Sequence, residues 1–440
     1  MSDITHRRVL SIALPIVLSN ATVPVLGAVD TGVVGQLGQA APIGAVGVGA
    51  IVLASVYWIF GFLRMGTSGL AAQAHGAGDS AETGAILVRG LGIGVLAGLA
   101  LILLQAPLAW AAFRLAPASV EVEALARQYL AIRIWGAPAT IALYAVTGWL
   151  IAQERTRAVL VLQLVMNGLN VGLDLWFVLG LDWGVPGVAS ATLIAEYSGL
   201  ALGLWLCRSA FAGRAGADRS RLMAATAWRR MLAVNGDIML RSVLLQGSMT
   251  TFLFLGAGFG DVTLAANQIL LQFAEITAYA LDGFAFAAEA LVGQAVGARQ
   301  PQRVRQGAVR ASQWAVGGSL LLGLVFLVAG PAIVDLMTTS PEVQSAARAY
   351  LPWLIVMPVI AVASYMFDGI FIGATLTREM RNTMALSVVC YAGALVLLVP
   401  MLGNHGLWAG LMVLNLARGL TMAGFYPRAE RVAAHGLVSS

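Results

Sequence analysis

Residues 308–330 read AVRASQWAVGGSLLLGLVFLVAG, and Arg310 is the only charged residue among them. A helix needs about 20 apolar residues to cross a hydrocarbon core about 30 Å thick, so this stretch predicts a transmembrane helix. The same criterion predicts twelve spans in all: residues 9–36, 42–72, 85–109, 123–152, 158–180, 186–207, 229–257, 262–296, 308–330, 345–374, 382–402 and 405–427. The predicted fold class is therefore an all-α integral membrane protein.

The composition of the chain agrees with this prediction and excludes several classes of protein. Hydrophobic residues make up 59% of the chain and charged residues 11%, whereas about a quarter of an average soluble protein is charged. All 26 basic residues are arginine, which excludes a P-loop ATPase and Schiff-base chemistry, since both require lysine. Two cysteines and four scattered histidines do not make a zinc cluster. We expect no enzyme, no metal and no cofactor.

The distribution of arginine predicts the orientation in the membrane. Most arginines flank one side of the predicted spans, among them Arg7, Arg8, Arg89, Arg155, Arg157, Arg208, Arg214, Arg219, Arg221, Arg229, Arg230, Arg299, Arg303, Arg305, Arg310, Arg378, Arg381, Arg428 and Arg431. Only Arg114, Arg127 and Arg348 flank the other side. Because positive residues stay in the cytoplasm, both termini should be cytoplasmic. The net charge of +5 then needs no nucleic-acid partner.

The chain is a tandem repeat with an offset of 221 residues. Thirteen of 37 positions are identical between residues 121–157 and 342–378, and the same offset aligns QAHGA (73–77) with QAVGA (294–298). Six spans per half predict two parallel six-helix lobes, related by a pseudo-two-fold axis along the membrane normal. The predicted organisation is an N-terminal lobe (1–207), a cytoplasmic linker (208–228) and a C-terminal lobe (229–440).

Several charged residues occur in just one of the two copies of the repeat, which indicates that the two lobes are specialised. Asp30 aligns with Thr251, and the helix that corresponds to that of Asp174 contains no acid. The second half has its own acids, Asp237, Asp282 and Asp368, which align with Ile16, Gly61 and Thr147. Ionisable groups within a membrane span are costly and are functional candidates by default.

The first lobe contains a predicted coupling site. Counting inward from the predicted outer helix ends places Asp30, Tyr129, Asp174 and Thr192 at one depth, about 9 Å below the surface at 1.5 Å per residue. Asn170 lies one helical turn from Asp174 on the same face. We expect one hydrogen-bonded cavity with no basic residue at its depth, in which the two acids titrate jointly. The alternative is that each polar residue makes a separate packing contact.

Two prolines predict a hinge in the first span. Pro15 and Pro24 both precede Asp30, and proline removes a backbone hydrogen bond where a helix can bend. A different use of small residues is predicted in GLGIGVLAG (90–98), where Gly90, Gly94 and Gly98 allow neighbouring helices to approach closely.

The second lobe contains a different polar set. Asp237 and Arg241 are spaced i,i+4, while Glu275 and Asp282 share a stripe of one helix and Asp368 lies in the inner half of another. We expect an inner ion network centred on Arg241. A cation site is the alternative interpretation.

Four segments resemble the multidrug and toxic compound extrusion (MATE) family, most of all its bacterial DinF-like branch. They are GAVDTGVVGQLG around Asp30, MNGLNVGLD ending at Asp174, ALDGFAFAAEALVGQAVGA from residue 280 and DGIFIGATLTREMRN from residue 368. The resemblance implies cation-driven efflux of organic cations. It further implies proton coupling through Asp30, Asn170, Asp174 and Thr192 with bending at Pro15, and Tyr129 matches by position.

The sequence leaves three transport functions to distinguish. The first is a proton-coupled antiporter for small organic cations or drugs, acting as a monomer in the lipid bilayer. The second is a sodium-coupled antiporter, although the acidic pair that sodium-coupled relatives carry in the second lobe has no clear match here. The third is a flippase for lipid-linked saccharides, which would favour a more basic cleft. An intramembrane enzyme is the least favoured alternative, because the chain has no GxSxG elbow, metal cluster or catalytic lysine.

The predicted orientation can be tested by thiol labelling. In a variant without Cys207 and Cys390, Ala217→Cys should resist an impermeant thiol reagent added to intact cells, because the linker is cytoplasmic. Ala118→Cys, between the third and fourth spans, should react readily and serves as the control. Ready labelling at residue 217 would overturn the orientation.

Overall fold

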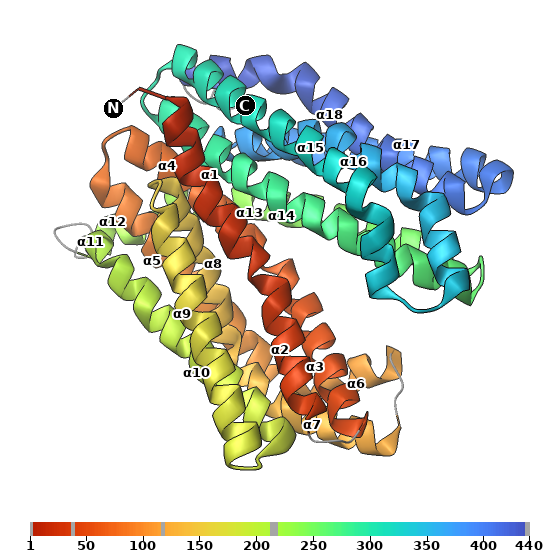
Figure 1. Ribbon diagram of the computed structural model, residues 1–440. Helices are drawn as coiled ribbons and strands as arrows, with labels where there is room; N and C mark the ends of the chain where they lie inside the picture. Colours follow the sequence, from red (N-terminus) through yellow and green to blue (C-terminus); the bar gives the residue numbers. More distant parts are fainter. Residues whose placement is uncertain (1–2, 37–39, 116–118, 212–218, 436–440) are drawn as a thin grey trace. The chain divides into compact units, whose positions relative to one another are not determined.

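The computed structural model describes residues 3–36, 40–115, 119–211 and 219–435, and these are helical with short connections (Figure 1). The elements are α1 (His6–Ala21), α2 (Val23–Gly35), α3 (Ala40–Ile59), α4 (Phe62–Gly76), α5 (Ser80–Leu103), α6 (Gln105–Leu115), α7 (Val120–Arg133), η1 (Ile134–Gly136), α8 (Ala137–Ala152), α9 (Thr156–Asp174), η2 (Leu175–Gly180), α10 (Gly184–Leu206), α11 (Arg208–Phe211), α12 (Arg219–Leu222), α13 (Ala225–Ala257), α14 (Asp261–Gly297), α15 (Pro301–Met337), α16 (Pro341–Gly373), α17 (Thr377–Leu402) and α18 (Asn404–His435).

The described residues contain 11 helical segments long and apolar enough to cross a membrane. The first predicted span is divided into α1 and α2, and neither part alone reaches that length. The division falls at Thr22, next to Pro24 in the first turn of α2, whereas Pro15 lies inside α1. Proline has no backbone N–H to continue the i→i−4 hydrogen bonds of a helix, which explains an interruption just ahead of Pro24.

Several spans begin earlier or break where the sequence predicts continuity. Helix α7 begins at Val120 because the side chain of Ser119 accepts a hydrogen bond from the amide of Val122. The fourth span then passes through the 3₁₀ turn η1 into α8, and the fifth ends in the π-helical segment η2. Apolar length predicts that a span exists, while caps and local hydrogen bonds decide where it starts and breaks.

Two compact units divide the chain. One contains residues 1–17, 72–78 and 232–440, and the other contains residues 18–71 and 79–231. The predicted lobes differ from these units, since the first helical turns of the chain and the end of α4 group with the second half. The boundary after residue 231 also places the linker with the first half.

Glycines in α5 allow close packing against α8 within the second of these units. A Cβ atom at Gly94 would stand 2.8 Å from backbone atoms of Ala142, and one at Gly98 would overlap the backbone of Pro138. At Gly90 the same atom would stand 2.9 Å from the Cβ of Ala145. The predicted packing role of these three glycines is confirmed.

The two copies of the repeated QAxGA motif lie against each other within the other unit. A Cβ atom at Gly76 would overlap the carbonyl of Gln294, and a Cβ atom at Gly297 would overlap the carbonyl of Gln73. The amide of Gln73 also donates to the carbonyl of Gly373 (2.9 Å). This reciprocal contact explains why the end of α4 groups with the second half of the chain.

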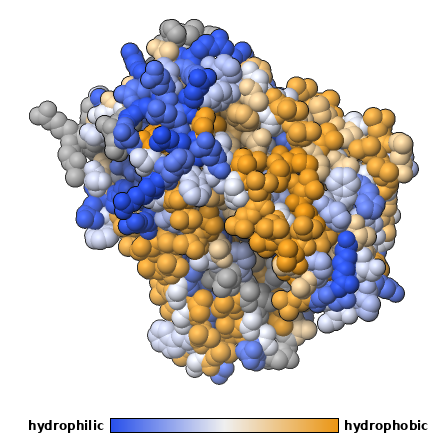
Figure 2. All heavy atoms as spheres, turned by 45° about the horizontal axis from the view of Figure 1, so that its top comes forward, coloured by the Kyte–Doolittle hydropathy of each residue, from blue (hydrophilic) through white to orange (hydrophobic). Residues whose placement is uncertain are grey.

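Apolar side chains face outward over long stretches of the helices. Leu103, Val328 and Met401 are 83%, 75% and 78% exposed. Figure 2 shows large continuous areas of hydrophobic side chains on one face, with hydrophilic side chains gathered mainly in its upper part. Exposed apolar surface of this extent suits a lipid environment and would be a liability in water.

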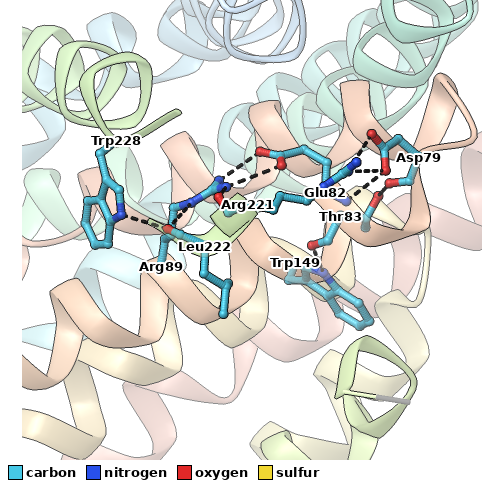
Figure 3. Close-up of polar contacts among 8 residues, drawn as sticks. All are labelled: Asp79, Glu82, Thr83, Arg89, Trp149, Arg221, Leu222 and Trp228. Atoms are coloured by element: carbon cyan, nitrogen blue, oxygen red, sulfur yellow. Dashed lines mark hydrogen bonds and ion pairs between the residues drawn. The ribbon is translucent and has the colours of Figure 1, made fainter. Parts of the chain in front are cut away.

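The linker is fastened to the first turns of α5 by a polar network (Figure 3). Arg221 donates to both carboxylate oxygens of Asp79, at 2.8 and 2.9 Å. The buried Arg89 pairs with Glu82 and also donates to the carbonyl of Arg221 (2.9 Å), and the indole of Trp228 donates to the carbonyl of Leu222 (2.9 Å). Residues 219–228 are therefore fixed to α5 rather than forming a free tether.

Asp79 has two structural roles, since it binds Arg221 of the linker and also caps α5. Its carboxylate also accepts a hydrogen bond from the amide of Glu82 (2.9 Å), which caps α5. Partial burial alone would raise the pKa of Asp79, but the Glu82 amide and Arg221 outweigh it and lower the pKa. A lowered pKa means that this contribution to stability is full above the ordinary value of 3.8 and is lost as the pH falls through the lowered value.

We predict that Asp79→Asn loosens the linker without unfolding α5, because asparagine retains the cap but loses the charge. Tryptic cleavage after Arg221 should become about two- to five-fold faster, as expected for a partly exposed ion pair. Asp335→Asn, which removes the partner of the exposed Arg348, is the matched control and should leave the cleavage unchanged. Equal cleavage rates in wild type and Asp79→Asn would contradict the network, and any difference in melting temperature between them should disappear at strongly acidic pH.

Candidate functional site

Asp30 and Asp174 meet inside the unit that contains α2 and α9. The two carboxyl groups lie close enough to interact with each other, and Asp174 is fully buried. No donor in the described part of the chain reaches either oxygen of Asp174 or Oδ1 of Asp30. Buried carboxylates normally accept hydrogen bonds, so this pair has capacity for a proton or a cationic ligand.

Asn170 and Thr192 lie beside this pair. Asn170 precedes Asp174 by one turn of α9, and its amide donates to the hydroxyl of Thr192 on α10 (3.2 Å). The Thr192 hydroxyl in turn donates to the carbonyl of Val188 (3.0 Å). Asn170 is 1% exposed, and its carbonyl oxygen has no donor among the described residues. The contact connects α9 to α10 and leaves the Asn170 carbonyl oxygen as a further unused acceptor near the acids.

Tyr129 also belongs to this cluster. It is buried on α7, and its phenol lies close enough to Asp30, Arg133 and Glu196 to interact with all three. Its ring packs where a Cβ atom of Gly49 would be, so α3 approaches α7 closely at this point. The structure thus brings together the five residues that the sequence predicts for the coupling site.

A buried ion pair next to the acids was not expected from the sequence. Arg133 of α7 donates to both oxygens of Glu196 on α10, at 2.7 and 2.8 Å. The charge of Arg133 acts on Asp30 and on Asp174. The prediction that no basic residue lies at this depth is therefore wrong. Gly136 makes room for the pair, since a Cβ atom there would overlap a carboxylate oxygen of Glu196.

The predicted depths of Tyr129 and Thr192 are inaccurate, although the predicted residues do lie near one another. Tyr129 and Thr192 lie further from their helix starts than six residues, because α7 begins at Val120 and α10 at Gly184. Hydrogen bonding between α9 and α10, rather than equal counts from the helix ends, brings the polar groups together.

The interruption of the first span is tied to the same helix as the acids. The amide of Asn167 on α9 donates to the hydroxyl of Thr22 (2.9 Å), at the junction of α1 and α2. Gln163 orients Asn167 by donating to its carbonyl oxygen (2.8 Å). Of the two predicted hinge residues, Pro24 adjoins this junction and Pro15 does not.

The other unit contains a buried cluster of two arginines and one acid. Arg241 of α13 forms an ion pair with Asp368 of α16, and Arg418 of α18 donates to the same carboxylate oxygen at 2.7 Å. Asp282 and Tyr365 interact electrostatically with Arg241. The predicted network therefore includes Arg241, Asp282 and Asp368, but Arg418 was missed.

Asp237 and Glu275 do not join that cluster in the predicted way. Asp237 accepts hydrogen bonds from Arg381 (2.6 Å) and from Thr377 (3.2 Å), so the predicted pair with Arg241 is wrong. Asp237 thus pairs with Arg381 of a different helix, α17, and not with its i,i+4 neighbour Arg241. Glu275 is exposed and makes no ion pair with the described residues. No group of three metal-ligating side chains occurs among the described residues.

The Arg133–Glu196 pair should contribute strongly to stability. Arg133→Leu places at this position the residue type that the second half carries as Leu354, but it leaves Glu196 buried and unpaired. Thermal unfolding in detergent should show a loss of about 3–5 kcal/mol. The double variant Arg133→Leu/Glu196→Leu should recover most of this loss, whereas additive losses would show that the two charges are not coupled.

Comparison of the chain with known proteins shows the family to which it belongs. A family model described as MatE matches residues 15–176 and 238–400. The DNA damage-inducible protein F of Escherichia coli (strain K12) is 42% identical over 421 residues, covering 95% of this chain and 91% of that protein. A probable multidrug resistance protein NorM of Synechococcus sp. is 27% identical, covering 94% of this chain and 92% of that protein.

Solved structures share the fold along almost the whole chain. The Vibrio cholerae MATE transporter VcmN in the bent form has a TM-score of 0.86 at 23% identity, with 98% of each chain covered. A MOP superfamily transporter from Pyrococcus furiosus has a TM-score of 0.85 at 20% identity, with 97% of this chain and 96% of that chain covered. The protein is thus a multi-pass membrane protein and not an enzyme, and the chain belongs to the MATE family of membrane transporters.

Proposed function

We propose that the protein is an antiporter that exports organic cations in exchange for protons, with Asp30 and Asp174 as the shared exchange site. The contact between these two acids carries the proposal. Two adjacent carboxylates in a low-dielectric site repel each other strongly when both are ionised. The pair therefore requires a proton or another cation between the two groups, and competition between those occupants is what an antiporter needs.

The neighbouring ion pair supports this proposal by removing a competing acid. Glu196 has its own cation, since both of its oxygens accept hydrogen bonds from Arg133. That pair is close to neutral, so the uncompensated charge of the cluster belongs to Asp30 and Asp174. Arg133 is a positioning residue here, because its positive charge acts on both acids. That charge disfavours binding of a proton and an organic cation at the same time, and so favours exchange of one for the other.

The polar surroundings suit both occupants. The unused oxygen of Asn170 and the phenol of Tyr129 lie next to the acids and can hydrogen-bond an ammonium group. Protonation removes the charge that attracts a cation while leaving these neutral groups in place. An organic cation therefore binds the deprotonated site and leaves when the site is protonated.

The position of the acids connects this exchange to a helix movement. Asp30 is carried by α2, which begins directly after the interruption at Thr22, and Asp174 is at the end of α9. A change in the attraction between the two carboxyls changes the force between α2 and α9. The hydrogen bond between Asn167 and Thr22 holds the start of α2 to α9, so α2 can pivot at that point.

We propose the orientation that follows from the arginine distribution, with both termini on the cytoplasmic side of a bacterial inner membrane. Outside protonation of the pair then accompanies release of the exported cation. The name of the Synechococcus relative, a probable multidrug resistance protein, supports drug-like organic cations as the substrate class.

Sodium is the competing coupling ion, because carboxylate and amide oxygens also bind hard cations. A buried acidic candidate of the other unit, Asp368, already has two arginines as partners. Its charge is thus compensated without a bound ion. This favours protons, and a direct comparison of the two gradients decides the matter.

The proposal predicts that Asp30→Asn abolishes proton-driven efflux of a cationic dye from proteoliposomes while the protein stays folded. Asp174→Asn should have the same effect, because the two groups form one site. The measurement compares an imposed pH gradient with an imposed sodium gradient, and a loss of at least ten-fold is expected, in the range for removal of a proton-transfer group.

Asp261→Asn is the matched control, since Asp261 lies at the exposed start of α14 in the other unit. It should transport like wild type under both gradients. Efflux that follows only the sodium gradient, or undiminished proton-driven efflux by Asp30→Asn, would overturn the mechanism.

A further inference from the structure

A groove unrelated to the coupling site lies between three helices of the other unit. Helices α15, α16 and α18 pack against one another, and between them is a cavity with a volume of about 660 Å³. This volume lies within the range of known ligand sites. The residues that line it are Arg305, Ala308, Val309, Ser312, Gln313, Val316, Phe367, Ile370, Ala423 and Tyr426.

The lining has two chemically different ends. Val316, Phe367 and Ile370 form an apolar end, and the rings of Phe367 and Tyr426 are in contact. Arg305 and Gln313 are polar lining residues, and the Arg305 side chain is 71% exposed. No acidic residue belongs to the lining. An apolar slot with a cation at one end matches an amphipathic anion and disfavours an organic cation.

The sequence places this groove at the level of the lipid headgroups. The first ten residues of α15 contain Arg303, Arg305 and Arg310 and no acid, whereas the next twenty residues carry no charge. Trp314 lies at that transition and is 37% exposed. A change from arginine to apolar residues marked by an amphipathic aromatic ring is typical of the membrane–water interface.

Charge complementarity selects the occupant. Arg305 contacts Glu430 at 3.1 Å, Arg428 contacts Glu379 of α17 at 2.7 Å, and Arg303 lies 3.7 Å from Asp3. With Arg310 on α15 and Arg431 on α18, the ends of these two helices carry five arginines against these three acids. The ends of α15 and α18 that border the groove therefore keep a positive excess. We propose that the groove binds an anionic phospholipid, with its phosphate at Arg305 and one acyl chain along Val309, Val316 and Ile370.

The test uses native mass spectrometry of the delipidated protein with phosphatidylglycerol and phosphatidylcholine of identical acyl chains. Wild type should retain phosphatidylglycerol in preference, and Arg305→Gln should reduce that preference about five-fold, the factor for one basic residue near an anionic surface. Val316→Trp should reduce retention of both lipids by filling the apolar end. Arg305 is exposed, so its replacement does not threaten folding.

Two controls separate this site from general effects. Arg348→Gln removes an exposed, paired arginine elsewhere in the same unit, and Val328→Trp adds the same bulk on α15 outside the groove. Both should behave like wild type. Matching losses in the controls would overturn the proposal.

Two further outcomes would also overturn it. Glycerol phosphate that competes fully with the lipid, together with no effect of Val316→Trp, would mean a simple anion site. A change of oligomeric state in Val316→Trp with unchanged lipid retention would mean that a second copy of the chain occupies the groove. Lipid retention and oligomeric state are both measured without dye efflux, so the result is independent of the coupling mechanism.

Discussion

A hydrocarbon interior offers no hydrogen bonds, and this constraint accounts for most of the polar contacts in the protein. Glu196 has Arg133 as its partner, and Asp368 has both Arg241 and Arg418. Neutral groups follow the same rule, since Asn267 and Asn404 exchange hydrogen bonds at 2.7 and 2.9 Å in a fully apolar core. Against this background Asp174 is a fully buried acid, and neither of its carboxylate oxygens receives a donor from the described residues. An exception to such a costly rule is a reasonable place to look for function.

Duplication of the chain conserves packing and allows charge to diverge. The two QAxGA motifs touch through Gly76 and Gly297, where any side chain would overlap the facing backbone. The buried charges follow a different pattern, because Arg133 aligns with Leu354 and Arg418 aligns with Tyr197. Each unit has thus built its own ion pairs on a shared helical frame. The groove at Arg305 is another local property of one unit, formed where α15 changes from charged to apolar.

The sequence was sufficient to predict the helical class and the residues that meet around Asp174, and its twelve predicted spans compare with 11 span-length helical segments among the described residues and a divided first span. These features follow from apolar length and from the cost of burying charge, and both can be read along the chain. It was not sufficient to predict which charges pair. Asp237 pairs with Arg381 across helices although Arg241 is four residues away, and contacts of that kind depend on packing. Arg133 was missed, although charge in only one copy of the repeat, the criterion that selected Asp30, applies to it as well.

The division of the chain into units gives the interruption at Thr22 a particular meaning. Residues up to 17 group with one unit and residues from 18 with the other. Ala13 and Val17 are held firmly in the first, since a Cβ atom at Gly283 would overlap Val17 and approach the carbonyl of Ala13. Asp30 lies beyond the interruption, on α2, and interacts with α9. Under the mechanism that we propose, a helix anchored on one side of a break and carrying Asp30 on the other would convert occupancy of the acid pair into a change of angle at the break. A continuous first helix would transmit the same force along its whole length, where the backbone contacts around Gly283 oppose it.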